Sequence, residues 1–214
     1  MRRWIWLCLW FISAFLTGYA QEVREIHVEK PGTLADKIAA IEDFSSNATV
    51  KITGELYNSD FKAFQKWKGY VWSLDLSDAI IDTIPEQSFS GIDLKKVVFP
   101  SSLVRIDKKA FASCIGLKEI DLSPCIDLLY IGSSAFSACN ALQKIDISAC
   151  SKLKYLGDYV FSGCSKLKSI DLSKNENLKE INDLSFYGNI SCKRLRDATI
   201  VVQTRVFSFV IKKR

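Results

Sequence analysis

The cysteines are the residues of this chain whose type and spacing most suggest chemistry. Five of the seven form one series, in which the gaps alternate between 11 and 14 residues: Cys114, Cys125, Cys139, Cys150 and Cys164. Regularly spaced cysteines can form disulfides, hold zinc or supply a nucleophile. Zinc is disfavoured because the series contains no CxxC pair and the chain has one histidine, His27.

Catalysis finds no support elsewhere in the sequence. GxSxG, HExxH, P-loop and GxGxxG patterns are absent. A cysteine nucleophile needs a neighbouring base, and His27 lies far away in a segment that reads as an exposed strand. We therefore expect no enzyme activity, no cofactor and no metal site. The formal net charge of +5 is too small to indicate nucleic-acid binding.

The cysteines belong to a repeat of 25 residues. Phe111, Phe136, Phe161 and Phe186 keep this period, and so do Asp121, Asp146 and Asp171. Three consecutive segments read LKEIDLSPCIDLLYIGSSAFSAC, LQKIDISACSKLKYLGDYVFSGC and LKSIDLSKNENLKEINDLSFYGN. Their common pattern is LxxIDLSxCxxLxxIGxxAFxxC. Shorter or more divergent copies flank them, so the chain holds five to six copies.

Each copy predicts one coil of an α/β repeat solenoid. The apolar residues of LxxIxL alternate, which predicts a short strand with one buried face. A second LxxI pair and the AF dipeptide supply further buried side chains. One coil cannot bury its apolar face alone, whereas stacked coils make a continuous core. Recurrent Gly, Pro and Ser argue against a helix bundle.

Stacking places equivalent cysteines above one another in two columns. Cys114, Cys139 and Cys164 form a column that continues at Asn189. Cys125 and Cys150 form another, which continues at Asn175. Asparagine cannot form a disulfide, so these positions favour a small buried side chain with some hydrogen-bonding capacity. We predict structural, mostly free thiols. Disulfides remain the alternative, although parallel Cβ vectors within a column suit them poorly.

The residues between the buried ones of LxxIDLS are predicted to point outward. They form the candidate partner-binding face: Asp75, Asp121, Asp146, Asp171, Glu119 and Lys144. A row of carboxylates could meet a basic partner or hold calcium. The alternative is a solvated face whose aspartates also bond to local backbone.

The flanks do not follow the repeat. Residues 1–20 have the charged, apolar and small-residue regions of a secretory signal peptide, without a lipobox. Residues 21–70 read as a capping segment, with a helix that Thr33 and Asp36 would cap as a capping box. A second helix is expected from residue 58 or 59. The repeats occupy residues 71–201, and residues 202–214 are an atypical strand or a truncated tail.

LxxIDLS followed by LxxIGxxAFxxC resembles the BspA-like bacterial surface leucine-rich repeats. The resemblance implies a non-catalytic secreted or cell-surface protein that binds an extracellular protein or glycan, as in adhesion. No transmembrane segment is expected once the signal peptide is removed. A self-associating secreted scaffold is the alternative function.

Overall fold

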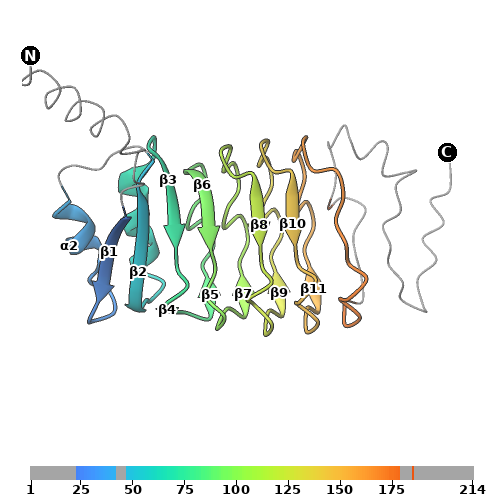
Figure 1. Cartoon of the computed structure of the whole chain (residues 1–214), viewed down its shortest axis with the longest axis horizontal. Coiled ribbons are helices and arrows are strands. Elements are labelled where there is room, and N and C mark those ends of the chain that lie inside the picture. The colour runs from blue at the N-terminus through green and yellow to red at the C-terminus, as the bar shows by residue number, and fades with distance from the viewer. Residues whose placement is uncertain (1–22, 42–46, 179–184, 186–214) are drawn as a thin grey trace, which may run out of the picture.

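The computed structural model describes residues 23–41, 47–178 and 185. Within them the chain winds as a solenoid of stacked coils, with an α/β segment at its N-terminal end (Figure 1). The predicted repeat solenoid is confirmed. The predicted signal peptide, Asn189, Phe186 and the tail at residues 202–214 lie outside the described residues.

One side of the solenoid carries two parallel sheets that continue one another along the stack, β1-β2-β3-β6 and β8-β10; together they are termed the first sheet. Its strands run side by side in chain order (Figure 1). They are β1 (Val23–Val28), β2 (Thr49–Glu55), β3 (Val71–Asp75), β6 (Asp93–Val98), β8 (Glu119–Asp121) and β10 (Lys144–Asp146). The short strand β4 (Ala79–Ile80) also pairs with β2. The register joins Glu119 to Lys144 and Asp121 to Asp146, so equivalent residues of successive coils are neighbours.

A second, shorter sheet runs along another side of the same coils. Each of its strands has two residues, one pointing inward and one outward. They are β5 (Thr83–Ile84), β7 (Arg105–Ile106), β9 (Tyr130–Ile131) and β11 (Tyr155–Leu156). Parallel pairing in the order β5-β7-β9-β11 again keeps equivalent residues together.

The third side has no strands but is equally regular. In each coil the backbone has positive φ two residues before and two residues after the repeated phenylalanine, as at Ser134 (58°) and Ala138 (57°). The amide N–H of every second residue then donates to a carbonyl of the next coil, as from Phe111 to Ala135 at 2.8 Å. We term this row of bonds the turn ladder.

The turn ladder is polar. The peptide between Ala110 and Phe111 accepts from the Phe89 N–H and donates to the Ala135 carbonyl. Peptide dipoles therefore align head to tail, as they do in an α-helix. The carbonyl end points toward the N-terminus. There the Gln65 amide donates to the Ser88 carbonyl at 3.3 Å, and the Lys68 ammonium lies beside Gly91.

The core is a file of side chains from successive coils. The phenylalanine rings stack with centroids 5.1 Å apart between Phe89 and Phe111, 5.4 Å between Phe111 and Phe136, and 5.9 Å between Phe136 and Phe161. Phe61 and Phe64 extend this aromatic packing into the N-terminal segment, because each ring contacts Phe89. One apolar core thus runs through both regions.

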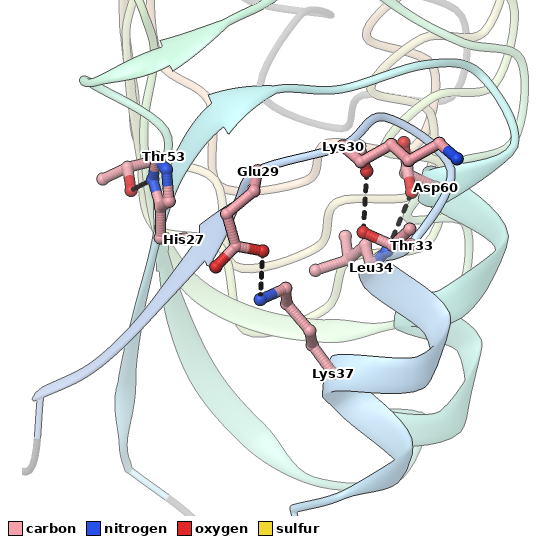
Figure 2. A network of polar contacts seen from close by, with 8 residues as sticks. All are labelled: His27, Glu29, Lys30, Thr33, Leu34, Lys37, Thr53 and Asp60. Atoms are coloured by element: carbon pink, nitrogen blue, oxygen red, sulfur yellow. Dashed lines mark hydrogen bonds and ion pairs between the residues drawn. The ribbon is translucent and has the colours of Figure 1, made fainter.

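The N-terminal segment contains α2 (Leu34–Ala39) and the 3₁₀-helix η1 (Asp60–Trp67). The predicted capping box is wrong: Thr33 makes no side-chain capping bond and donates its hydroxyl to the Lys30 carbonyl at 2.6 Å. Instead Asp60 caps α2 from 26 residues away, accepting the Leu34 N–H at 3.0 Å (Figure 2).

Asp60 joins three parts of this segment. Besides the Leu34 N–H, its carboxylate accepts the N–H of Gly32 at 2.8 Å and that of Tyr57 at 2.9 Å. The residue is only 1% exposed. The second helix follows its prediction more closely, since Phe61, Phe64 and Trp67 are buried on one face of η1.

Candidate binding face

The outward residues of the first sheet lie where the pattern places them along the strands. Glu119 and Lys144 are neighbours in one column and are exposed, and Asp121 and Asp146 are neighbours in the next. Asp171 occupies the equivalent position of the following coil and is exposed. The structure therefore brings together Asp121, Asp146 and Asp171, which we term the acidic row.

Asp75 does not join the acidic row. Its neighbour on β6 is Val98, which interrupts the carboxylates. On the other side Asp75 adjoins Lys51 of β2. Lys51 forms an ion pair with Asp78 at 2.6 Å, and the hydrogen bond with Asp78 raises the pKa of the Lys51 ammonium. The N-terminal part of the column is thus mixed in charge.

Each aspartate of the row also begins a turn, and Asp121 and Asp146 are the last residues of β8 and β10. One carboxylate oxygen accepts the backbone N–H two residues ahead: Asp121 from Ser123 at 2.9 Å, Asp146 from Ser148 at 3.0 Å, and Asp171 from Ser173 at 2.9 Å. These are Asx-turns, in which a short side chain takes the place of a backbone acceptor. The DxS spacing therefore has a local structural use.

For Asp146 and Asp171, the same contacts favour the ionised carboxylate. The Ser148 hydroxyl and backbone N–H hold the pKa of Asp146 below its usual range. The Ser173 backbone N–H and hydroxyl lower the pKa of Asp171 in the same way. In all three turns the serine N–H donates to Oδ1, so Oδ2 of each carboxylate can accept from an external group.

A row of lysines runs beside the acidic row, two or three residues before the aspartates in the sequence. Lys118, Lys144 and Lys168 are exposed, one in each coil; we term them the basic row. Only Lys144 was recognised from the sequence. Lys118 and Lys168 directly follow the first leucine of LxxIDLS. This position is not among the outward positions that the sequence pattern predicts.

None of the ion pairs within the described part of the chain includes the six charged groups of the two rows. These ion pairs lie elsewhere, for example between Lys152 and Asp127 at 2.5 Å and between Arg105 and Asp107 at 3.0 Å. The nearby ammonium groups of Lys144 and Lys174 contribute to the lowered pKa of Asp146 and Asp171 without forming such a pair.

The cysteine columns lie inside the solenoid. The five described thiols are free and buried. Each donates to a carbonyl of the preceding coil, as from Cys139 to Phe111 at 3.1 Å and from Cys150 to Leu122 at 3.4 Å. Asn175 makes the equivalent contact to Ile147 at 3.0 Å. This position of the repeat therefore takes a small side chain that can donate a hydrogen bond to the preceding coil.

These thiols are poor nucleophiles. Burial raises the pKa of the Cys125 and Cys150 thiols to about 12. Contact with the preceding thiol of the column, together with burial, raises the pKa of Cys139 and Cys164. A thiol reacts as its thiolate, so these groups are inert at neutral pH while the coil is folded. Within residues 23–41, 47–178 and 185, no cluster of potential metal ligands occurs.

The outward residues of the second sheet are of another kind. The Arg105 guanidinium lies 4.2 Å from the centre of the Tyr130 ring, and Tyr130 stacks on Tyr155 at 4.7 Å. Both faces of the Tyr130 ring are therefore already occupied.

A shallow hollow of about 580 Å³ lies at the N-terminal end, between β1 and the end of α2. Its wall includes His27 and Lys37. His27 bonds to the Thr53 hydroxyl at 2.8 Å and Lys37 pairs with Glu29 at 2.7 Å (Figure 2). Both side chains thus have partners within the fold. No helix within the described residues is long and apolar enough to cross a bilayer.

Comparison with known proteins identifies the repeat. A family model described as the BspA type leucine-rich repeat region matches residues 82–209 in six copies. A solved leucine-rich repeat protein from Bacteroides ovatus is 25% identical, with a TM-score of 0.54 over 78% of this chain. The match covers 43% of that protein, so the chain spans less than half of its length.

Two further solved structures are more distant. A leucine-rich cell surface protein from Faecalibacterium prausnitzii is 17% identical, with a TM-score of 0.29 over 78% of this chain and 71% of the other. The pneumococcal vaccine antigen PcpA is 20% identical, with a TM-score of 0.40 over 74% of this chain and 42% of the other. No curated protein matches the chain.

Proposed function

Because this chain belongs to the BspA-type leucine-rich repeat family, we propose that it is a non-catalytic binding protein that acts outside the cell. Leucine-rich repeats of this kind generally serve as binding scaffolds. The first sheet is the proposed binding face, and an extracellular protein or glycan is the proposed ligand class, as in adhesion.

One observation supports the proposal: the acidic and basic rows lie side by side on one side of the solenoid, and no ion pair within the described residues includes them. The aspartates also serve their Asx-turns, but a fold gains little stability from surface charges of this kind. Arranged in rows, they offer a partner a fixed electrostatic pattern. Complementary charge patterns mainly confer specificity and faster association.

The interior supports a non-catalytic role. The thiols are buried, protonated and used as donors to the preceding coil. The basic and acidic rows contain no histidine or cysteine that could transfer a proton or attack a substrate near neutral pH. Action outside the cell rests on the leader-like residues 1–20.

A ligand screen with three matched variants tests this proposal. The protein is assayed against a panel of matrix proteins and glycans by surface-immobilised binding. One variant removes the acidic row as Asp121→Asn, Asp146→Asn and Asp171→Asn, which keeps an acceptor for each Asx-turn. A second reverses the basic row as Lys118→Glu, Lys144→Glu and Lys168→Glu.

The control variant reverses three exposed lysines away from the first sheet: Lys62→Glu, Lys109→Glu and Lys154→Glu. It changes the net charge as much as the basic-row variant does. We expect a ligand of the native protein to be lost in at least one row variant and retained in the control. Equal binding by all four proteins would exclude the first sheet as the binding face.

A further inference from the structure

The two charged rows give the first sheet a polarity across its strands. In each of three consecutive coils an exposed lysine precedes an aspartate: Lys144 and Asp146 bound β10, Lys118 lies just before β8, and Lys168 precedes Asp171 in the following coil. The two charges are two residues apart in the middle coil and three in the other two, or about 7 to 10 Å in extended chain, and successive coils follow about every 4.8 Å.

A partner that matched this pattern would need two rows of opposite charge with the same repeat distance. A globular surface has no reason to carry charges at the spacing of β-strands. A second copy of this chain has that spacing by construction, which makes it the natural occupant of the face.

The required arrangement is a two-fold symmetric one. We propose that the first sheets of two copies pair face to face about a two-fold axis parallel to the solenoid axis. This rotation turns the first sheet of the other copy over, so that the strands of the two facing sheets run in opposite directions. The basic row of each copy then lies over the acidic row of the other, coil against equivalent coil. The contact is isologous and closed, so it makes dimers.

Other orientations fail on charge. A two-fold axis parallel to the strands would place lysine over lysine and aspartate over aspartate. Like charges facing each other are repelled, and at an interface this costs several kcal/mol. The charge pattern therefore selects one pairing.

Residues beside the rows fit with one exception. Lys95 and Lys96 extend the basic end of the sheet onto β6 and are exposed. They would face the neutral Val98 of the other copy, which neither favours nor opposes pairing. Glu119 is the exception, because it places an acidic side chain at the basic end of β8.

The contact is small and polar. The six strands of the first sheet are separated by five steps of about 4.8 Å, so the face is about 24 Å long. Such an area lies at or below the low end for specific protein interfaces, so association should be weak and reversible. Exposed ion pairs are also screened by salt. The dimer should accordingly form at high protein concentration and dissociate as salt is raised.

This inference rests on the proposed function only in using the same face, and it names a second copy as the partner. If one copy were held on each of two surfaces, pairing of the two copies would join the surfaces without any other ligand.

Sedimentation velocity over a concentration series tests the pairing, with the variants already described. We expect the native protein to dimerise. The dissociation constant of the dimer should be about tenfold lower, or lower still, at about 50 mM NaCl than at about 500 mM NaCl. The basic-row variant should be monomeric because acidic rows then face each other. The acidic-row variant should associate weakly, and the Lys62, Lys109 and Lys154 control should match the native protein.

The decisive arm mixes the two row variants. In a mixed pair, the unaltered lysines of the acidic-row variant face the unaltered aspartates of the basic-row variant, and the other contact is neutral. The mixture should form dimers that neither variant forms as well alone. Circular dichroism melting confirms that each variant is folded.

Two results would overturn the inference. One is a native protein that stays monomeric at low salt, and the other is equal dimerisation by the basic-row variant and the control variant. If self-pairing is refuted, the proposal that the first sheet binds an extracellular ligand can still be tested separately. A monomeric protein that still bound a panel ligand through this face would refute self-pairing alone, whereas dimers without any panel ligand would refute the heterologous ligand alone.

Discussion

The N-terminal segment and the repeats hold their cores together by different means. In the N-terminal segment one buried carboxylate, that of Asp60, accepts three backbone N–H groups from separate turns. In the repeats each coil makes its own small set of bonds to the coil before it, through a thiol, a turn ladder and two short sheets. Stabilisation is therefore concentrated in the first region and distributed in the second.

This difference follows from periodicity. A repeat can place the same weak interaction at every coil, because stacking brings equivalent residues into register. A segment without repeats has to satisfy each buried backbone group individually. The predictions below test this contrast, beginning with the largest effect.

Replacing Asp60 should have the largest effect. Asp60→Ala leaves buried N–H groups without acceptors, and we expect a loss of about 4 kcal/mol from three bonds to a charged acceptor. Asp60→Asn keeps one acceptor oxygen and should lose about half as much. Chemical denaturation measures both, and hydrogen exchange should show the increase in opening first within residues 23–70. A loss below about 1 kcal/mol for the alanine variant would remove Asp60 from its central role.

A single thiol should matter less. Cys139→Ala removes one donor and a sulfur atom from a packed column, with an expected cost of about 1 to 2 kcal/mol. Cys139→Ser keeps a donor to the Phe111 carbonyl and serves as the matched control for the hydrogen bond. If Cys139→Ala cost as much as Asp60→Ala, stabilisation in the repeats would not be distributed.

The thiols also predict a loss of stability at alkaline pH. The pKa of Cys125 and Cys150 is raised to about 12 in the folded protein, from an ordinary value of 9.0. The unfolded chain therefore loses these protons first, and stability falls as pH rises from about 9 to about 12. The double variant Cys125→Ala/Cys150→Ala should have a flatter melting profile over this range. Parallel profiles for the variant and the native protein would contradict this account.

The turn ladder offers a pair of opposite substitutions at one column. Ala138 and Gly163 are equivalent residues with φ of 57° and 75°. Glycine adopts this conformation without the penalty of about 1 kcal/mol that other residues incur. Ala138→Gly should therefore stabilise the protein by up to about 1 kcal/mol, and Gly163→Ala should destabilise it by about as much. If both substitutions shifted the melting temperature in the same direction, the two positions would not share the positive-φ conformation that the turn ladder requires.

Neutralising an outer charge should have the smallest effect on stability. Asp146→Asn retains an acceptor for the Ser148 N–H and leaves a solvent-exposed position, so we expect a change within about 0.5 kcal/mol. Thermal melting checks this value. A large loss would mean that the acidic row serves the fold more than it serves binding.

Most of the repeat architecture could be predicted because one pattern recurs. The 25-residue period placed Phe111, Phe136 and Phe161 in one file and separated inward from outward residues. The turn ladder was not foreseen, because positive φ at Gln87, Lys109 and Tyr159 leaves no signature in residue type. The Asp60 cap was missed for a related reason: Asp60 and Leu34 are brought together only by tertiary folding, whereas Thr33 and Asp36 matched a local motif.

The candidate face was predicted in part. The aspartates stood out through their period, but the interruption at Val98 was given no weight. The basic row went unnoticed since Lys118 and Lys168 alternate with Gln143 at their own position, and Lys144 lies one residue further on. The exposure of a lysine before the aspartate in each of three successive coils shows that these lysines lie together on one side of the acidic row.

The central claim is that coil-by-coil register separates reduced interior columns from exposed charged rows. Peptide mapping after thiol labelling tests it most directly, with one reagent applied to the folded protein and a second after unfolding without reductant. We predict that Cys114, Cys125, Cys139, Cys150 and Cys164 carry only the second label. A first label on these residues, or a disulfide-linked peptide joining Cys139 to Cys164, would contradict the account.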